Sequence, residues 1–486
     1  MGARTGKQYI EQLNKLRPTV QIDGETVTEN IAEHPAFSGV VNTFAELYDM
    51  QHDAVLKDVL TYESPTTGDR VGTSFMVPKT QEDLMKRREA AAAWANHSFG
   101  MLGRTGDYLN SALMALSTAT DWFSKADQNG PEYAENARKY YEYVRENDLL
   151  TTHTLIPPQV NRSVSGSQQG GGQLSARIVE ENEEGVTITG ARMLGTVAPI
   201  ADEILVFPST VLRGTPEDAA YSYAFALPTD TPGLRFLCRR SLDGGGGHFN
   251  EPLASRFEEM DAVVVFDNVK VPRERIFMLG NPQLCNGFYT ETGATAHMTH
   301  QVVTRTTAKS EFFGALLTEM AESIGIDGFS HIQEDIAEVL VAAELGRSTL
   351  RAAEADAALN EFGVMTPKWS ALNAARNWYP KISQRFPAIV RKFGASGLMG
   401  LPGEADVFGD ASGDIETYLQ GKNVTGPERV RLFRLAFDAA VSAFAGRQSL
   451  YEYYFFGDPV RMAGAYVNAV DTSESRERVR KFLERG

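Results

Sequence analysis

The sequence predicts a multidomain α+β protein in which a β-rich middle part lies between two helical parts. Three observations support this prediction. The chain has 486 residues, more than one hydrophobic core ordinarily contains. Hydrophobic residues make up 42% of the chain and charged residues 23%, the balance of a globular protein rather than a disordered one. The spacing of apolar residues changes twice, near residues 150 and 280, from helical to alternating and back.

The first part, residues 1–150, has mainly helical patterns. Residues 80–99 begin with Thr80, a residue type that caps helices, followed by an acidic first turn and a run of alanines. Residues 130–147 begin with a proline in the first turn and repeat aromatic side chains at helical spacing. We therefore expect an N-terminal helical domain.

The middle part, residues 151–280, has strand patterns. Residues 176–193 contain two β-branched runs around a Glu-Gly turn, which is typical of a hairpin. Three further segments are each bounded by proline, glycine or charged turns and are predicted as strands: residues 202–212, 220–228 and 261–272.

The helical period returns from about residue 295 and continues through the last part, residues 281–486. Residues 329–359 and 424–457 are each predicted to form one long amphipathic helix, the second with Pro427 near its start and Gly457 after its end.

The composition excludes several classes of protein. The net charge of −16 argues against a nucleic-acid or anionic-membrane partner, and no apolar run is long enough to cross a membrane. The two cysteines, Cys238 and Cys285, are too far apart for a metal-binding pair, and the N-terminus has no apolar signal core. We expect a cytoplasmic enzyme with reduced thiols.

Motifs for nucleotide binding and nucleophilic catalysis are missing. The glycine-rich segments 163–173 and 243–247 lack the strand–turn–helix context of a phosphate loop, so both are predicted as flexible loops. His297 and His300 have a spacing that could bind a metal, but no third ligand lies nearby. We therefore expect no metal.

The stretch "MLGRTGDYLNSALMAL" (101–116) places Arg104 and Tyr108 four residues apart at the start of an apolar helix. Spacing alone favours a structural interpretation, a surface arginine and a tyrosine at a helix start. The alternative is a site for an anionic or phenolic ligand, with a permanent charge from arginine and a hydroxyl from tyrosine. The segment "TTHTLIPPQVNR" (151–162) adds His153. Two prolines then stiffen the chain, and the amides and the cation that follow them are suited to binding a polar ring or a phosphate.

At these residues the sequence resembles the oxygenase components of two-component, reduced-flavin-dependent aromatic hydroxylases, the family of 4-hydroxyphenylacetate 3-monooxygenase. The resemblance extends over nearly the whole chain. It includes "ARTGKQYIEQL" near the start, "GRTGDYLN" (103–110), "TTHTLIPPQVNR" (151–162), "GARMLGT" (190–196), "FPST" (207–210), "SRFEEMD" (255–261), "GASGLMGLP" (394–402) and "FFGDPVRM" (455–462).

The resemblance implies an acyl-CoA dehydrogenase-like fold with an N-terminal helical domain, a central β-barrel domain and a C-terminal helix bundle. It implies a homotetramer formed through the C-terminal helices. It also implies FAD as the cofactor, supplied as FADH2 by a separate NAD(P)H:flavin reductase, and ortho-hydroxylation of 4-hydroxyphenylacetate by a flavin C4a-hydroperoxide formed with O2.

The resemblance assigns roles to particular residues. Arg104, Tyr108 and His153 match residues that bind the phenolic hydroxyl of the substrate, where donors stabilise a developing phenolate. Ser209 and Thr210 match residues that bind the carboxylate of the substrate. The matches to flavin contacts are Gln159, Val160, Asn161, Arg162, Thr196, Phe456, Gly457, Asp458 and Pro459.

Other activities remain open. The segment 163–173 departs from the family in length and composition where a substrate-covering loop would lie, so another phenol (simple, halogenated or hydroxycinnamate-like) is an alternative substrate. An acyl-CoA dehydrogenase-like flavoenzyme is a further alternative. A dehydratase on this fold would need an iron–sulfur cluster, which two isolated cysteines cannot hold.

Overall fold

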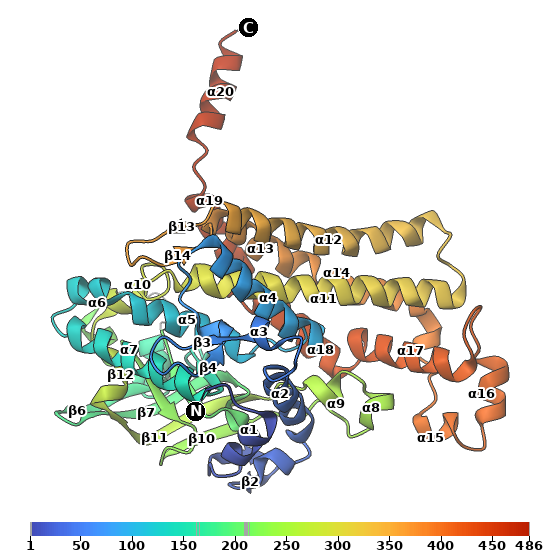
Figure 1. Ribbon diagram of the computed structural model, residues 1–486, viewed down its shortest axis with the longest axis horizontal. Helices are drawn as coiled ribbons and strands as arrows, with labels where there is room; N and C mark the ends of the chain where they lie inside the picture. Colours follow the sequence, from blue (N-terminus) through green and yellow to red (C-terminus); the bar gives the residue numbers. More distant parts are fainter. Residues whose placement is uncertain (1, 162, 165, 209–211, 213, 486) are drawn as a thin grey trace.

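The computed structural model describes residues 2–161, 163–164, 166–208, 212 and 214–485. It confirms the predicted order of a helical part, a β-rich part and a second helical part (Figure 1). The sheets and the C-terminal helices lie on opposite sides of the N-terminal helices α4 (Gln81–His97) and α5 (Gly106–Thr118).

The N-terminal helices begin and end close to their predicted bounds. The side chain of Thr80 accepts a hydrogen bond from the backbone N–H of Asp83, and Asp83 accepts one in return from the Thr80 N–H, so α4 starts with a capping box. The other long helices here are α1 (Gly6–Leu13), α2 (Ser38–Met50) and α7 (Gly130–Asn147).

The strands form two main sheets. The six-stranded sheet has the order β2-β1-β10-β11-β7-β6 and the four-stranded sheet the order β12-β9-β8-β5. The strands of the first are β1 (Thr19–Ile22), β2 (Glu25–Val27), β6 (Arg177–Asn182), β7 (Gly185–Thr196), β10 (Leu234–Cys238) and β11 (Asp261–Pro272). Those of the second are β5 (Thr151–Thr154), β8 (Glu203–Val206), β9 (Tyr223–Pro228) and β12 (Ile276–Leu279).

Two features of the sheets differ from expectation. The described strands of the central part form two separate sheets, so the predicted closed β-barrel is not confirmed, although an isolated bridge joins Ile156 to Met193 of β7. In addition, β1 comes from the N-terminal part and pairs in parallel with β10, so residues 19–27 extend the central sheet. The residue pattern of so short a segment does not indicate which distant strand pairs with it.

The C-terminal helices pack around α11 (Ala294–Ile324), which is buried along most of its length. Residues 424–457 form two helices where one was predicted, α17 (Gly426–Ala440) and α18 (Ala443–Tyr454). The break lies at Ser442, whose side chain accepts a hydrogen bond from the Ala445 N–H and so starts a new helix. The remaining long helices are α12 (Ser330–Ala355), α13 (Trp369–Ile382) and α14 (Arg385–Gly394).

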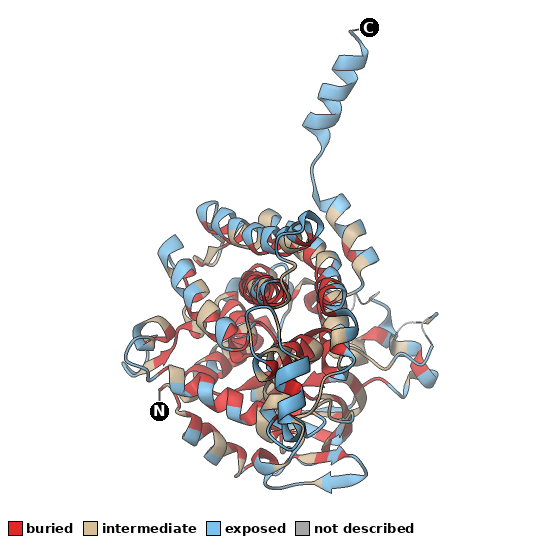
Figure 2. Cartoon of the chain, turned by 90° about the vertical axis from the view of Figure 1, so that its right-hand side faces the viewer, coloured by how far each residue is buried: buried red, intermediate tan, exposed pale blue. Residues whose placement is uncertain are grey.

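The chain ends with two helices, α19 (Pro459–Ala469) and α20 (Ser473–Leu483). The last projects away from the body of the molecule and is exposed along its whole length (Figure 2). Among the described residues, no helix combines the length and the apolar character needed to span a membrane.

Candidate active site

Arg104 and Tyr108 lie at the start of α5, which confirms the predicted helix there. The Arg104 guanidinium carbon lies 4.9 Å from the centroid of the Tyr108 ring and 4.6 Å from that of Phe455, the residue after α18. These distances are typical of cation–π contacts. The cation is therefore held between aromatic rings from two distant parts of the chain.

His153 lies on β5 and faces the same place. Its ring centroid is 5.8 Å from that of Tyr108. The side chain is buried, and its Nδ1 atom has no hydrogen-bond partner among the described residues. Burial, assisted by the nearby Arg104 cation, lowers the pKa of His153 well below its ordinary value, so the imidazole is neutral. The structure thus brings Arg104, Tyr108 and His153 into one cluster.

The charge of Arg104 is not neutralised by a carboxylate. Its Nη1 donates to the carbonyl oxygen of Gly103 at 3.1 Å and to the hydroxyl of Tyr451 at 2.5 Å, both neutral acceptors. None of the described carboxylates forms an ion pair with the guanidinium. A guanidinium without a carboxylate partner stabilises an anionic ligand that binds beside it.

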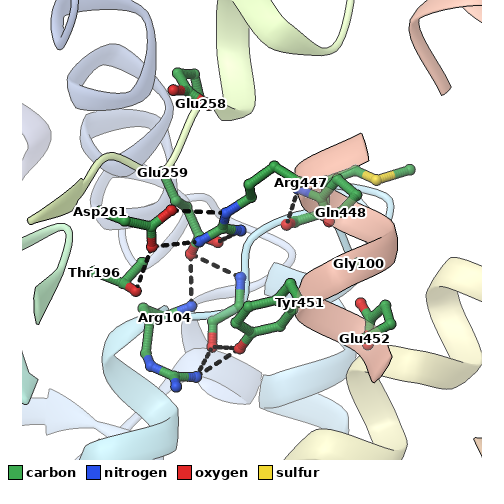
Figure 3. Close-up of polar contacts among 12 residues, drawn as sticks. Gly100, Arg104, Thr196, Glu258, Glu259, Asp261, Arg447, Gln448, Tyr451 and Glu452 are labelled. Atoms are coloured by element: carbon green, nitrogen blue, oxygen red, sulfur yellow. Dashed lines mark hydrogen bonds and ion pairs between the residues drawn. The ribbon is translucent and has the colours of Figure 1, made fainter. Parts of the chain in front are cut away.

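Glu259 fixes the backbone of the arginine. One carboxylate oxygen, Oε1, accepts from the N–H groups of Gly103 at 2.7 Å and Arg104 at 2.6 Å (Figure 3). The other, Oε2, accepts from Arg447 of α18 at 3.0 Å. Glu259 is fully buried. Its charge is therefore used to hold the loop in place.

Arg447 connects this loop to the central sheet. It donates to both oxygens of Asp261, at 2.9 and 3.0 Å, and Thr196 donates to the same carboxylate at 2.7 Å (Figure 3). Burial would raise the pKa of Asp261, but the Arg447 and Arg239 cations hold it well below its usual value. Asp261 therefore stays ionised, and the hydroxyl of Thr196, a predicted flavin contact, is already used as a donor.

The helix α18 is itself anchored by a buried ionic cluster. Glu452 accepts two bonds from Arg305, at 2.6 and 2.8 Å, and one from Lys309 at 2.7 Å. Arg305 also donates to the carbonyl oxygen of Gly100 at 2.8 Å, and Gln448 to that of Met101 at 3.1 Å. This cluster therefore holds α11, α18 and the loop before Arg104 together.

The predicted flavin contacts near the C-terminus lie next to the cluster of Arg104, Tyr108 and His153. The Phe456 ring is 4.7 Å from that of Phe455. Gly457 has a φ of +109°, which favours glycine, and joins α18 to α19. Asp458 caps α19 by accepting from the N–H of Arg461 at 2.8 Å, and Pro459 is the first residue of that helix.

The predicted contacts after β5 lie in an exposed loop. Gln159, Val160 and Asn161 form no hydrogen bond with Arg104, Tyr108 or His153. Asn161 instead exchanges two hydrogen bonds with the buried Gln169, at 2.9 and 2.6 Å, and Tyr221 donates to the carbonyl oxygen of Gly172. Within the predicted loop 163–173, Gln169 and Gly172 are therefore held by hydrogen bonds to neighbouring residues. Arg162, Ser209 and Thr210 lie outside the described residues.

The sequence did not identify several residues that build the site. Tyr289 lies near Tyr108 and Arg104, and burial raises its pKa strongly. Its surroundings in the sequence give no signal. Glu259 lies in the family motif "SRFEEMD" (255–261), and Arg447 lies in the predicted helix 424–457. Neither pattern indicates a role in the site. Tyr451 and Phe455 belong to the aromatic run "YEYYFF" (451–456), whose density could have drawn attention to them.

The two histidines of α11 have different surroundings. Nε2 of His300 lies 2.8 Å from a carboxylate oxygen of Glu354, whereas the buried Nε2 of His297 has no hydrogen-bond partner in the described part of the chain. The described residues include no group of three or more potential ligands that could hold a metal ion.

Comparison with protein families gives two adjacent matches. Residues 5–278 match the model described as "4-hydroxyphenylacetate 3-hydroxylase N terminal", and residues 285–484 match "4-hydroxyphenylacetate 3-hydroxylase C terminal".

Individual proteins give the same result. The chain is 47% identical to a 4-hydroxyphenylacetate 3-monooxygenase oxygenase component from Geobacillus sp. (strain PA-9), with 99% of this chain and 97% of the relative covered. It is 48% identical to the protein of that name from Thermus thermophilus, with 99% and 98% covered. A crystal structure of such a component with FAD and 4-hydroxyphenylacetate superposes with a TM-score of 0.94 at 47% identity, covering 99% of both chains.

Proposed function

Because the chain belongs to the 4-hydroxyphenylacetate 3-hydroxylase family, we propose that it is the oxygenase component of a two-component flavin monooxygenase. It hydroxylates 4-hydroxyphenylacetate to 3,4-dihydroxyphenylacetate with reduced FAD and O2. One observation supports this proposal most: an unneutralised guanidinium, Arg104, and a neutral imidazole, His153, both lie next to the ring of Tyr108.

The three residues act on the phenol of the substrate. The neutral His153 accepts a hydrogen bond from the phenolic hydroxyl, which raises the electron density on the phenolic oxygen. Arg104 stabilises the negative charge that develops on the oxygen, and Tyr108 supplies a hydroxyl to the same atom. A phenolate pushes electron density onto the ring carbon beside it, which makes the ortho position reactive.

The residues near the C-terminus fit the cofactor. Reduced FAD supplies, with O2, the electrophilic oxygen atom. At Gly457 the turn after α18 passes close to Arg461, because an added Cβ would lie only 3.2 Å from Nη2 of that arginine. We assign flavin contacts to this turn (Phe456, Gly457, Asp458 and Pro459) and to Gln159, Val160, Asn161, Arg162 and Thr196.

The remaining features of the enzyme are part of the same proposal. A separate NAD(P)H:flavin reductase supplies the reduced FAD, and the protein acts in the cytoplasm as a homotetramer formed through the C-terminal helices. The domains are residues 1–150, 151–280 and 281–486. The gap between the two family matches, after residue 278, supports the second boundary.

Acyl-CoA dehydrogenation is a weaker alternative because it needs a free glutamate as the base. Glu259 is occupied by two backbone N–H groups and Arg447, and Glu452 by Arg305 and Lys309.

The function is tested by supplying reduced FAD and O2 with a panel of phenols. We expect a catechol product from 4-hydroxyphenylacetate at the highest kcat/KM of the panel. A higher kcat/KM for a halogenated phenol or a hydroxycinnamate would replace the substrate assignment. Absence of any catechol would contradict the proposed reaction.

Replacing His153 with alanine should uncouple oxygen consumption from hydroxylation. A phenol that has lost its hydrogen-bond partner is misplaced relative to the oxygen donor, so more O2 ends as free hydrogen peroxide. The measurement is the ratio of catechol to peroxide at saturating substrate. His331→Ala, on the exposed face of α12, is the control and should leave this ratio unchanged. An unchanged ratio in His153→Ala would remove His153 from the site.

Ser209 and Thr210 provide a test of the substrate's acid tail, based on their match to the family. A hydrogen bond to a charged group contributes about 1.5–3 kcal/mol. The double change Ser209→Ala and Thr210→Val should therefore raise the KM for 4-hydroxyphenylacetate about tenfold or more. It should change the KM for 4-ethylphenol much less. Equal effects on both substrates would indicate a structural role instead.

A further inference from the structure

A second arginine near the site lacks a counter-charge. Arg376 lies on α13, with its guanidinium carbon 5.5 Å from the Trp369 ring and 5.4 Å from the Phe456 ring. Its Nε atom is buried, and among the described residues it has no hydrogen-bond partner and no carboxylate that forms an ion pair with it. Other arginines around the site, such as Arg305 and Arg447, are bound to carboxylates.

Arg376 and Arg104 contact two neighbouring aromatic rings of the site. The rings of Phe455 and Phe456 are 4.7 Å apart. Arg104 contacts the first of these rings and Arg376 the second. The Arg376 cation is close enough to Tyr108 to oppose the rise in its pKa that burial causes. The aromatic pair is thus flanked by two guanidinium groups.

The space beside Arg376 is large enough for part of a ligand. Arg376 and Phe456 line a cavity of about 170 Å³ together with Val303, Thr306 and Tyr379. A cavity of about 150 Å³ can hold a molecule as large as benzene. Besides Arg376, the polar side chains of the lining are neutral hydroxyl groups, those of Thr306, Thr307, Ser310, Thr349 and Tyr379. The guanidinium is therefore the only side chain in the described lining that carries a charge.

Arg376 is partly buried, so its guanidinium loses part of its hydration without gaining a counter-ion among the described residues. Burial lowers the pKa of Arg376; the Tyr108 hydroxyl opposes this effect and the nearby Arg461 cation adds to it. Arg461 follows the turn to which flavin contacts are assigned. Both arginines therefore keep a charge that is available to an anionic ligand.

We propose that Arg376 is a flavin-binding residue whose guanidinium contacts a negatively charged group of FAD beside Phe456. The proposal rests on the proposed function, which supplies the ligand. Two groups of reduced FAD carry negative charge, the diphosphate and the ring system of the anionic reduced flavin, and both would satisfy the same cation.

The test is the binding of flavins to R376Q and R376K under anaerobic conditions. We expect R376Q to raise the Kd for reduced FAD tenfold or more. R376K should raise the Kd less, because the lysine keeps the charge but loses the planar fork of donors. R431Q removes an exposed cation from α17 and is the matched control, with no change expected. If R376Q does not fold, a rise in Kd for R376K alone supports the proposal and an unchanged Kd overturns it.

Riboflavin and oxidised FAD identify the anionic group. A loss of affinity for FAD but not for riboflavin assigns Arg376 to the diphosphate. A loss for both flavins that is larger in the reduced state assigns it to the ring. Unchanged binding of every flavin, or an effect confined to the KM of the phenolic acid, overturns the proposal. Failure of the wild-type protein to bind reduced FAD at all would instead contradict the proposed function.

Discussion

Replacing Arg104 with alanine should lower the rate of hydroxylation about 10²–10³-fold, equivalent to about 3–4 kcal/mol of transition-state stabilisation. The guanidinium has only neutral acceptors around it, so its charge is available to the phenolate that forms during the reaction. Alanine retains the backbone N–H that donates to Glu259, so the loop keeps its anchor. The measurement is single-turnover hydroxylation with reduced FAD.

Two comparisons separate a catalytic from a structural effect of this change. The Kd for reduced FAD should stay within a few-fold of the wild-type value. Arg104→Lys, which keeps the charge, should recover part of the lost rate. A normal rate in Arg104→Ala would contradict the assignment of Arg104 to the phenol, and an equal loss of flavin binding would make its role structural.

Replacing Glu452 with glutamine should lower the free energy of unfolding by about 3–5 kcal/mol, because it leaves two buried cations without their carboxylate. Glu452, Arg305 and Lys309 are all nearly inaccessible to solvent. Burial already lowers the pKa of Lys309 to about 8, so this side chain can release its proton when Glu452 is removed. The fall in the free energy of unfolding is therefore expected to lie nearer to about 3 than to about 5 kcal/mol.

The measurement is urea denaturation at one protein concentration. Glu477→Gln makes the same chemical change in an exposed cluster on α20 and should cost less than about 1 kcal/mol. Hydroxylation should also fall in Glu452→Gln, since Arg305 holds the carbonyl of Gly100 in the loop before Arg104. Equal stabilities of the two variants would show that the buried cluster is not what anchors α18.

The sequence predicted the elements whose signals are local. Thr80 and Asp83 encode the start of α4, and the predicted limits of α7 and β11 match the structure. It did not predict the break at Ser442, because the apolar period continues through it and only the serine side chain marks the new start. It also missed the pairing of β1 with β10, which depends on contacts more than two hundred residues apart.

The site shows the same division. Arg104, Tyr108 and His153 could be proposed from motifs, and the resemblance to a family predicted that all three bind the same phenolic hydroxyl. The supporting residues could not be proposed in this way. Glu259 and Arg447 have ordinary surroundings in the sequence, and their role comes from a hydrogen-bond network between the central sheet and α18. The lack of a described carboxylate beside Arg376 likewise depends on which residues the fold places around it.

The most direct test of the central claim compares 4-hydroxyphenylacetate with 4-methoxyphenylacetate, which has the same acid tail but no phenolic proton. Each is supplied with reduced FAD and O2, and hydroxylated product is measured against O2 consumed. If Arg104, Tyr108 and His153 act on the phenolic oxygen, the first substrate gives 3,4-dihydroxyphenylacetate and the second gives almost only hydrogen peroxide. Comparable hydroxylation of both compounds would contradict the account.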